Sequence, residues 1–261
     1  MQKENFAETY AKGQEPVQIK LSNGLRGIVE FVGRWGSWFI VPLVLVTVLD
    51  VVARKLTFRT AEGHAWGLQI FLKEHVSRYF ESTLLQELEW HLHTALFALV
   101  LGFGTIYNTH VRVDLVRDHV SFRKKIWIEF LGLTCFMIPY LLLVIYFASS
   151  WVFDSFKLGE ISASTVGLSH RWIIKGILVL GLIVATIAGV AVWLQVVTLI
   201  WGRNVKRFKL MTLDWPEDVS RIEGKERIVL DEAPGMQAPP EIAASIGAPP
   251  GGAQPAIKPA E

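Results

Sequence analysis

Residues 172–201 read WIIKGILVLGLIVATIAGVAVWLQVVTLIW, and the only charged side chain among them is Lys175. A helix that crosses a membrane needs roughly 20 apolar residues to pass a hydrocarbon core about 30 Å thick. Because backbone groups in lipid must hydrogen-bond within their own segment, an apolar run of this length predicts an α-helix. The stretch therefore predicts a transmembrane span.

Three further stretches have the same character, at residues 35–53, 88–107 and 126–153. The third and fourth spans are longer than the minimum, so we expect them to tilt or to extend past the hydrocarbon core. None of the runs alternates as a barrel strand does. The sequence predicts an all-α integral membrane protein with four transmembrane helices.

The composition agrees with a membrane location. Apolar residues make up 51% of the 261 residues, mean hydropathy is +0.36, and charged residues make up 19%, below the soluble average of about 25%. A net charge of +2 is too small to argue for a nucleic-acid partner. The single cysteine, Cys135, lies in an apolar run and excludes an intrachain disulfide.

Lys and Arg are distributed unevenly between the loops. The regions before the first span, between the second and third, and after the fourth together hold more Lys and Arg than the other two connections together. Since the more basic side of a membrane protein is cytoplasmic, we expect both termini inside a bacterial inner membrane and a multi-pass topology. Trp35 and Trp201 then fall at the inner interface, and Trp90 and Trp172 at the outer one.

The regions outside the spans differ in kind. Residues 1–34 form a cytoplasmic segment in which 13–34 is either an amphipathic surface helix or a plain lead-in to the first span, since four apolar residues recur there at helical spacing. These four are Leu21, Leu25, Ile28 and Val32. In the outer loop 54–87, a short helix is expected near residues 68–80.

The C-terminal region begins with a basic stretch. Residues 202–232 are expected to form a cytoplasmic basic segment, and residues 233–261 hold most of the 11 prolines mixed with Ala and Gly. A composition of that kind cannot bury a core, so we expect a disordered tail.

The densest polar cluster, residues 86–93, opens the second span. Glu87 and His91, and likewise Glu89 and His93, lie four residues apart and share a helix face. The cluster is a hydrated helix start with local Glu–His pairs, a helix or subunit contact that includes Trp90, or a metal or haem site. A metal site fits poorly, because histidines two residues apart point in different directions on a helix and no paired cysteines exist.

Two other polar groups lie near span ends. His110, Arg112 and Asp114 follow the second span and are expected to anchor the inner loop. Before the fourth span, Arg171 and Lys175 lie one turn apart beside Trp172. They either extend to the outer headgroups or contact an acidic group such as Glu160.

The fourth span carries Gly181, Ala185 and Gly189 on one stripe, which lets another helix approach closely. The spans lack a chain of ionisable residues near their middle, and Asp50 near the end of the first span is the nearest candidate. The sequence also lacks a phosphate-binding glycine loop, a nucleophile elbow and a paired-carboxylate site. We therefore expect no catalytic residues, no metal, no cofactor and no enzyme activity.

Taken together, the order and spacing of these motifs resemble a known family. Between about residues 30 and 201 the chain is similar to the small permease subunit, of the DctQ type, of tripartite ATP-independent periplasmic (TRAP) transporters, and most similar to the mannitol/chloroaromatic branch. The resemblance is carried by QELEWH at 86–91, HVRVD at 110–114, Gly159-Glu160 and, in 167–175, Gly167-Leu168 with RWIIK at 171–175. The sequence departs from the family pattern in the length of loop 54–87, in His93, in Ser169 and after residue 210.

The resemblance implies an accessory role. In this family a periplasmic binding protein captures an organic acid or a similar solute, and a large permease moves it with an ion gradient. The small subunit packs beside the large permease and helps to dock the binding protein, so the named polar residues would be interface or structural residues. Two alternatives stay open from the residues themselves: a haem-binding electron-transfer protein using His91 and His170, and a membrane scaffold unrelated to transport.

Overall fold

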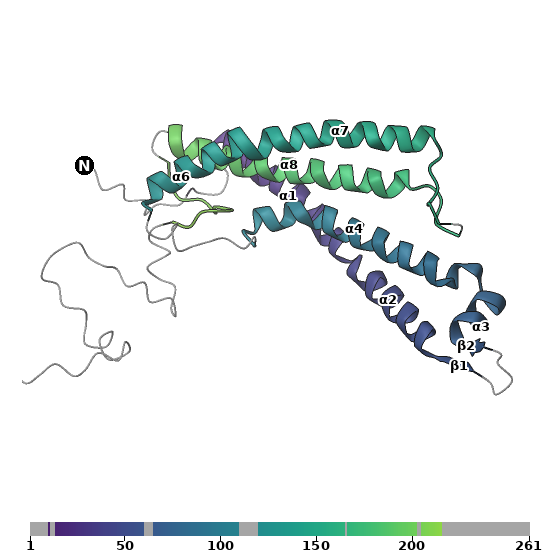
Figure 1. Ribbon diagram of the computed structural model, residues 1–261. Helices are drawn as coiled ribbons and strands as arrows, with labels where there is room; N and C mark the ends of the chain where they lie inside the picture. The colour runs from purple at the N-terminus through teal and green to yellow at the C-terminus, as the bar shows by residue number, and fades with distance from the viewer. Residues whose placement is uncertain are drawn as a thin grey trace, which may run out of the picture. The chain divides into compact units, whose positions relative to one another are not determined.

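The computed structural model describes residues 10, 14–59, 65–109, 120–164, 166–202 and 205–215. Within these ranges the chain is helical apart from one short hairpin (Figure 1), which confirms the predicted all-α class. The elements are α1 (Val17–Ser37), α2 (Ile40–Lys55), β1 (Thr57–Arg59), β2 (Ala65–Gly67), α3 (Leu68–His75), a 3₁₀ turn (Arg78–Phe80), α4 (Ser82–Ile106), α6 (Phe122–Leu131), a π-helical turn (Gly132–Met137), α7 (Ile138–Lys157) and α8 (Trp172–Trp201).

Three helical stretches in the described ranges are long and apolar enough to cross a membrane. They are Val17–Lys55, Phe122–Lys157 and Trp172–Trp201, with mean hydropathies of 2.1, 2.2 and 2.7. They contain the predicted spans at 35–53, 126–153 and 172–201. A chain with several such helices is a multi-pass membrane protein.

Helix α4 covers the predicted span at 88–107 but is not one of these three stretches. It has 25 residues, so its length suffices. Its first turns carry Glu87, Glu89, His91 and His93, and these polar side chains lower its mean hydropathy. The fourth span stays a prediction.

Two prolines mark the breaks in the long helices. Pro42 has no N–H for the carbonyl of Trp38 four residues earlier, and that carbonyl accepts from Val41 instead, at 3.1 Å. An i→i+3 hydrogen bond thus replaces the i→i+4 bond of the α-helix, and this break lies between α1 and α2. Pro139 likewise follows the π-helical turn, whose last bond runs from the Ile138 N–H to the Leu133 carbonyl.

Helix α8 lies at the centre of the packing and contacts α1, α4, α6 and α7, while α2 packs mainly against α4 (Figure 1). Small residues permit these contacts. A Cβ added at Gly181 would collide with the Ala98 carbonyl of α4, and one at Gly102 would lie 3.0 Å from the Val184 carbonyl of α8. Ala185, one helical turn after Gly181 on α8, is 2% exposed. The helices approach backbone to backbone, as small-residue contacts in membranes do.

Helix α1 packs against α4 and α8, and only part of its recurring apolar pattern takes part in this contact. Leu25 and Val32 are partly buried against the core, but Leu21 and Ile28 are 53% and 50% exposed. The buried positions are instead Ile19, Ser22, Val29, Gly33 and Gly36. The small residues among them allow the close approach of α4 and α8. The Ser22 hydroxyl donates to the Ala191 carbonyl of α8 at 2.7 Å.

The described part of the predicted outer loop 54–87 contains regular secondary structure. The expected short helix exists as α3 and the following 3₁₀ turn, with a break at Val76 and Ser77. It is preceded by a two-stranded antiparallel hairpin, in which Thr57 pairs with Gly67 and Arg59 with Ala65. The hairpin was not predicted.

Residues 205–215, expected to belong to a basic cytoplasmic segment, pack back onto the helices. The Gln195 amide of α8 donates to the Lys209 carbonyl, and its oxygen accepts from the Met211 N–H, each at 3.1 Å. Met211 and Leu213 join the main core, and Trp215 packs with Phe208. Residues 203–204 and 216–232 of this segment, and the tail 233–261, lie outside the described residues.

Candidate functional site

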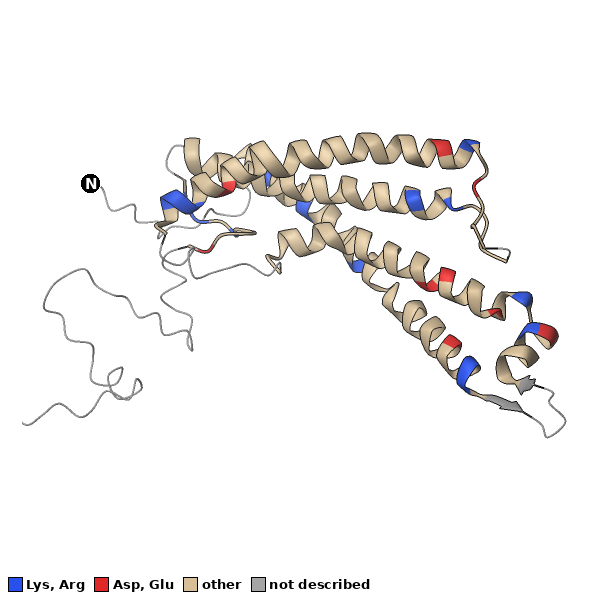
Figure 2. Ribbon diagram, in the orientation of Figure 1, with Lys and Arg blue, Asp and Glu red and all other residues tan. Residues whose placement is uncertain are grey.

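Charged residues gather near the ends of the helices, and the middle stretches of α2, α4, α7 and α8 carry neither acidic nor basic residues (Figure 2). At the ends of α2, α4, α7 and α8 that lie nearest α3 and the 158–171 loop, three carboxylates are prominent: Asp50, Glu87 and Glu160. A fourth, Glu89, lies two residues beyond Glu87 on α4. The chain supplies partners for the first three, whereas Glu89 Oε1 has none among the described residues.

Glu87 joins α4 to the loop that connects α7 with α8. One carboxylate oxygen accepts from the Ser162 hydroxyl, and the other accepts from the Leu168 N–H at 2.6 Å. A Cβ at Gly167 would collide with the Ser162 side chain and lie 2.8 Å from the Glu87 carboxylate, so glycine allows this approach. Both oxygens of Glu87 are thus occupied within the chain.

Glu160 makes a second contact in the same loop. Its carboxylate forms an ion pair with Lys175 of α8 and lies 3.8 Å from the Arg171 guanidinium. The hydrogen bond from Lys175 holds the pKa of Glu160 below its ordinary value of 4.5. Lys175 is 6% exposed, and its ammonium lies 4.0 Å from the centre of the Trp151 ring. We call the contacts of Glu87 and Glu160 with this loop and α8 the α4–α8 junction.

The aromatic side chain that opens α8 packs beside this junction. Trp172 meets Phe156 of α7 edge to face, with ring centroids 5.2 Å apart. The sequence allowed Arg171 and Lys175 either to extend to the outer headgroups or to contact an acidic group. The structure shows the contact with Glu160.

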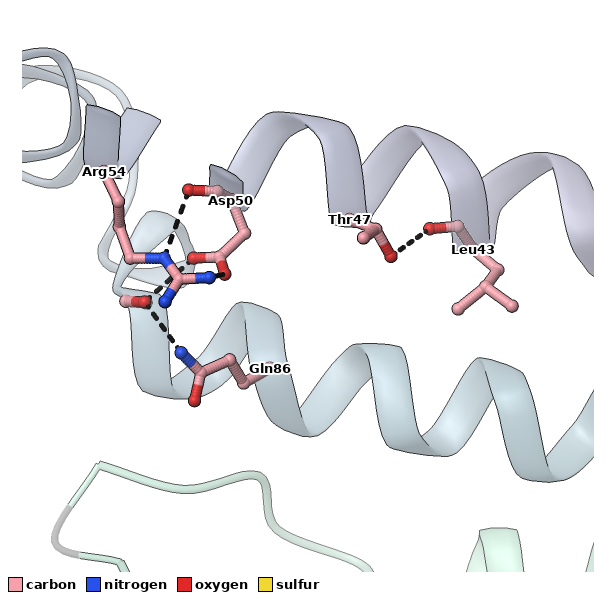
Figure 3. Close-up of polar contacts among 6 residues, drawn as sticks. Leu43, Thr47, Asp50, Arg54 and Gln86 are labelled. Carbon is pink, nitrogen blue, oxygen red and sulfur yellow. Dashed lines mark hydrogen bonds and ion pairs between the residues drawn. The ribbon is translucent and has the colours of Figure 1, made fainter. Parts of the chain in front are cut away.

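Asp50 ties α2 to α4 (Figure 3). It is fully buried, pairs with Arg54 at 2.5 Å, and accepts from the Ser82 hydroxyl at 2.8 Å. Gln86 donates to the same hydroxyl at 3.2 Å. Asp50 is thus a structural tie, since its charge is compensated one helical turn away.

Glu89 faces a different environment. With Trp90 and His93 it lines a groove of about 550 Å³ between α4 and the α2 residues Leu43, Val44, Thr47 and Val48. Its Oε1 is buried and has no hydrogen-bond partner in the described part of the chain. Trp90 is 73% exposed. We call this the α2–α4 groove.

The Glu–His pairs, one of the three interpretations of residues 86–93, do not form side-chain hydrogen bonds in the described chain. The Nδ1 of His91 lies 2.6 Å from the backbone carbonyl of Glu87, and the carboxylate of Glu87 binds elsewhere. Glu89 and His93 line the same groove without a hydrogen bond between them. A helix places the two side chains on one face, but it does not bring them into contact.

The residues of the metal and haem readings make local contacts. His170 hydrogen-bonds the neighbouring Ser169 at 2.9 Å, and His91 bonds its own helix. Among the described residues no three His, Cys, Asp or Glu side chains are grouped as a metal site requires. His110, Arg112 and Asp114 lie outside the described residues.

The stripe on α8 has two neighbours. Gly181 faces α4, and a Cβ at Gly189 would lie 3.1 Å from the Met137 methyl of the π-helical turn. Ala185 between these two glycines is buried. Sequence reasoning missed Ser162 and the Leu168 amide as partners of Glu87, because a loop conformation brings them there. It also missed Gln195, although a lone amide inside an apolar run was a signal for a buried polar contact.

These observations define a multi-pass membrane protein whose polar contacts join helix ends. Comparison of the chain with protein-family models, with curated proteins and with solved structures gives no match.

Proposed function

We propose that this chain is the small accessory membrane subunit of a TRAP transporter, packed against the large permease and helping to dock the periplasmic binding protein. The complex would take up an organic acid or a similar solute with an ion gradient. The observation that carries the proposal is the α4–α8 junction. Three of the four motifs on which the family resemblance rests, although separated by up to 81 positions, meet there around Glu87 and Glu160.

The proposal includes α4 as the fourth span. With it, both termini are cytoplasmic and the protein lies in a bacterial inner membrane. Pairing of Glu87 inside the chain supports this arrangement, because a carboxylate near a membrane helix end must find a partner or water. Trp90 and Trp172 then lie at the outer headgroup level, where indole rings are enriched.

An accessory role also fits the distribution of charge. A transport path usually has polar groups or broken helices near the middle of the membrane. In the described helices, Asp50, Glu87 and Glu160 are bound by the chain's own donors near helix ends. Groups occupied in this way hold a scaffold together and are not free to bind a solute.

The test is co-purification and uptake. We expect the tagged chain, expressed from its own chromosomal region in mild detergent, to bring down a larger membrane protein of many spans. Deletion of the chain should abolish solute uptake, and a plasmid copy should restore it. A chain that purifies alone as a monomer, together with unchanged uptake in the deletion strain, would show the proposal to be wrong.

A further inference from the structure

Glu89 differs from Asp50, Glu87 and Glu160, whose carboxylates are bound by other groups of the chain. Its Oε1 is buried and makes no hydrogen bond in the described part of the chain. The Thr47 hydroxyl, which lines the same groove, donates to the Leu43 carbonyl at 2.9 Å (Figure 3). Helix α4 has neither Lys nor Arg, and Arg54 of α2 is bound to Asp50. The rings of Trp90 and His93 carry the other N–H groups of the groove, and neither is bound to Glu89 Oε1, so a donor can come from a partner outside these two helices.

The shape of the surface indicates what carries this donor. A second cavity of about 380 Å³ continues from His93 along α4, past Phe97 and Val100 to Gly104. At 1.5 Å per residue, the exposed stripe from Trp90 to Gly104 is roughly 21 Å long. That length is about two thirds of a hydrocarbon core, so the surface fits a rod that lies across the membrane.

We propose that a transmembrane helix of the large permease lies along the α2–α4 groove and places a Lys or Arg side chain against Glu89. This rests on the proposed function, which supplies the identity of the partner. Charged residues within membranes pair with one another when they are buried between helices. Trp90, 73% exposed beside Glu89, has the character of the aromatic residues that dominate binding at interfaces.

Two other occupants of the α2–α4 groove, a second copy of the chain and a lipid, fit the Glu89 carboxylate less well. A symmetric second copy would bring the same surface to itself, and that surface holds Glu89 but neither Lys nor Arg, so the charge would stay uncompensated. A lipid amine could reach Glu89 from the headgroup level, where Trp90 lies, but a free lipid does not hold its amine in place. A packed partner helix fixes a basic side chain beside the carboxylate.

Photo-crosslinking in the intact transporter complex tests the proposal. A photoreactive residue replaces Val44, which lines the groove and is 52% exposed. The matched control replaces Leu143 of α7, which is 56% exposed and lies outside the groove. We expect Val44 to cross-link to a permease transmembrane segment that carries Lys or Arg, with a yield at least about tenfold above that of Leu143. Equal yields, or adducts of Val44 only with lipid or a second copy, would overturn the proposal.

Charge variants then test the pairing. Glu89→Lys should lower the Val44 yield at least about tenfold, and Glu89→Gln, which keeps the side-chain volume, should lower it less. Asp154→Lys, an exposed acidic position on α7, should leave it unchanged. Acidic replacement of the cross-linked Lys or Arg should restore the yield in Glu89→Lys. Failure of both Glu89 variants to reduce the yield contradicts the pairing.

The outcomes separate the two proposals. If the chain co-purifies with the permease while Val44 gives no permease adduct, the groove assignment is wrong and the proposed function stands. If Val44 cross-links to a Lys- or Arg-bearing helix of an unrelated membrane protein, the groove is a docking site and the TRAP assignment is wrong.

Discussion

Glu87 and Glu89 lie two residues apart on α4, and they have opposite surroundings. Two residues correspond to a rotation of roughly 200° about the helix axis, so the side chains face different neighbours. Glu87 is held by Ser162 and the Leu168 amide in the α4–α8 junction, whereas Glu89 Oε1 has no partner in the described chain. The comparison shows that two carboxylates on one helix can differ in whether the chain itself supplies their hydrogen-bond partners.

Charge reversal gives the largest expected difference between the two positions. Glu87→Lys would place a cation near Arg171 and leave the Leu168 N–H without its acceptor, so we expect a loss of about 2–3 kcal/mol in unfolding free energy. Glu89→Lys in the isolated chain breaks no bond and should cost less than about 1 kcal/mol. Thermal unfolding of both variants in the same detergent measures the difference.

An equal loss of unfolding free energy in both variants would contradict the conclusion that Glu87 is held by the chain and Glu89 is not. Glu74→Lys, on an exposed position of α3, serves as the control for charge reversal itself and should leave the melting temperature unchanged.

Glycine substitution extends the comparison from side chains to helix faces. Gly181→Leu would force α8 away from the Ala98 carbonyl of α4, at an expected cost of about 1–3 kcal/mol. The matched control is Gly176→Leu on the same helix, where a Cβ meets nothing within 4 Å. Thermal unfolding should separate the two variants. A Gly176 variant as unstable as the Gly181 variant would show that helix α8, and not its contact with α4, is responsible.

Whether a structural feature could be predicted from the sequence depends on how far apart in the chain the interacting residues lie. Helix positions follow from apolar runs, which act locally, and three stretches suited to crossing a membrane were found where they were predicted. The stripe of Gly181, Ala185 and Gly189 was also visible, because helical spacing alone places it on one face. A short apolar pattern does not, however, reveal which of two faces is buried, and in α1 the contact edge follows small residues such as Ser22 and Gly33.

The partners of the polar residues were less accessible. The contact of Glu160 with Lys175 was one of two readings, since both residues flank the same connection. The hydrogen bond from the Leu168 N–H to Glu87 joins residues 81 positions apart, and it depends on the path of a loop. Likewise, the two hydrogen bonds of Gln195 require residues 205–215 to turn back onto α8, and their basic composition gave no sign of it.

The Gln195 contact offers a test at the opposite end of α8. Gln195→Leu removes both hydrogen bonds to Lys209 and Met211 and leaves two backbone groups without partners, which should cost about 1–3 kcal/mol. We expect faster proteolysis after residue 205 in Gln195→Leu, with the α4–α8 junction intact. Gln86→Leu, an exposed amide on α4, is the control. Equal proteolysis in the two variants would show that the hydrophobic contacts of Met211 and Leu213 hold the segment without Gln195.

The smallest expected effect is the response of the junction to acid. Lys175 holds the pKa of Glu160 below its ordinary value of 4.5, with Arg171 contributing the same sign. A carboxylate whose pKa is lower in the folded state stabilises that state fully above its unfolded pKa, and this contribution is lost as the pH falls through the folded pKa. Between about pH 7 and pH 5 we therefore expect no change in the melting temperature from this group.

Below about pH 4.5, the melting temperature of the wild type should approach that of Glu160→Gln, which lacks the ionisable group. Because Glu160 is solvent-accessible, the difference at neutral pH should be small, and cleavage within the 158–171 loop is the more sensitive measurement. Asp154→Asn, an exposed carboxylate at the end of α7, controls for the general effect of acid. If the Glu160→Gln loop keeps the acid-dependent cleavage of the wild type, another carboxylate, of which Glu87 is the nearest in the junction, governs its stability.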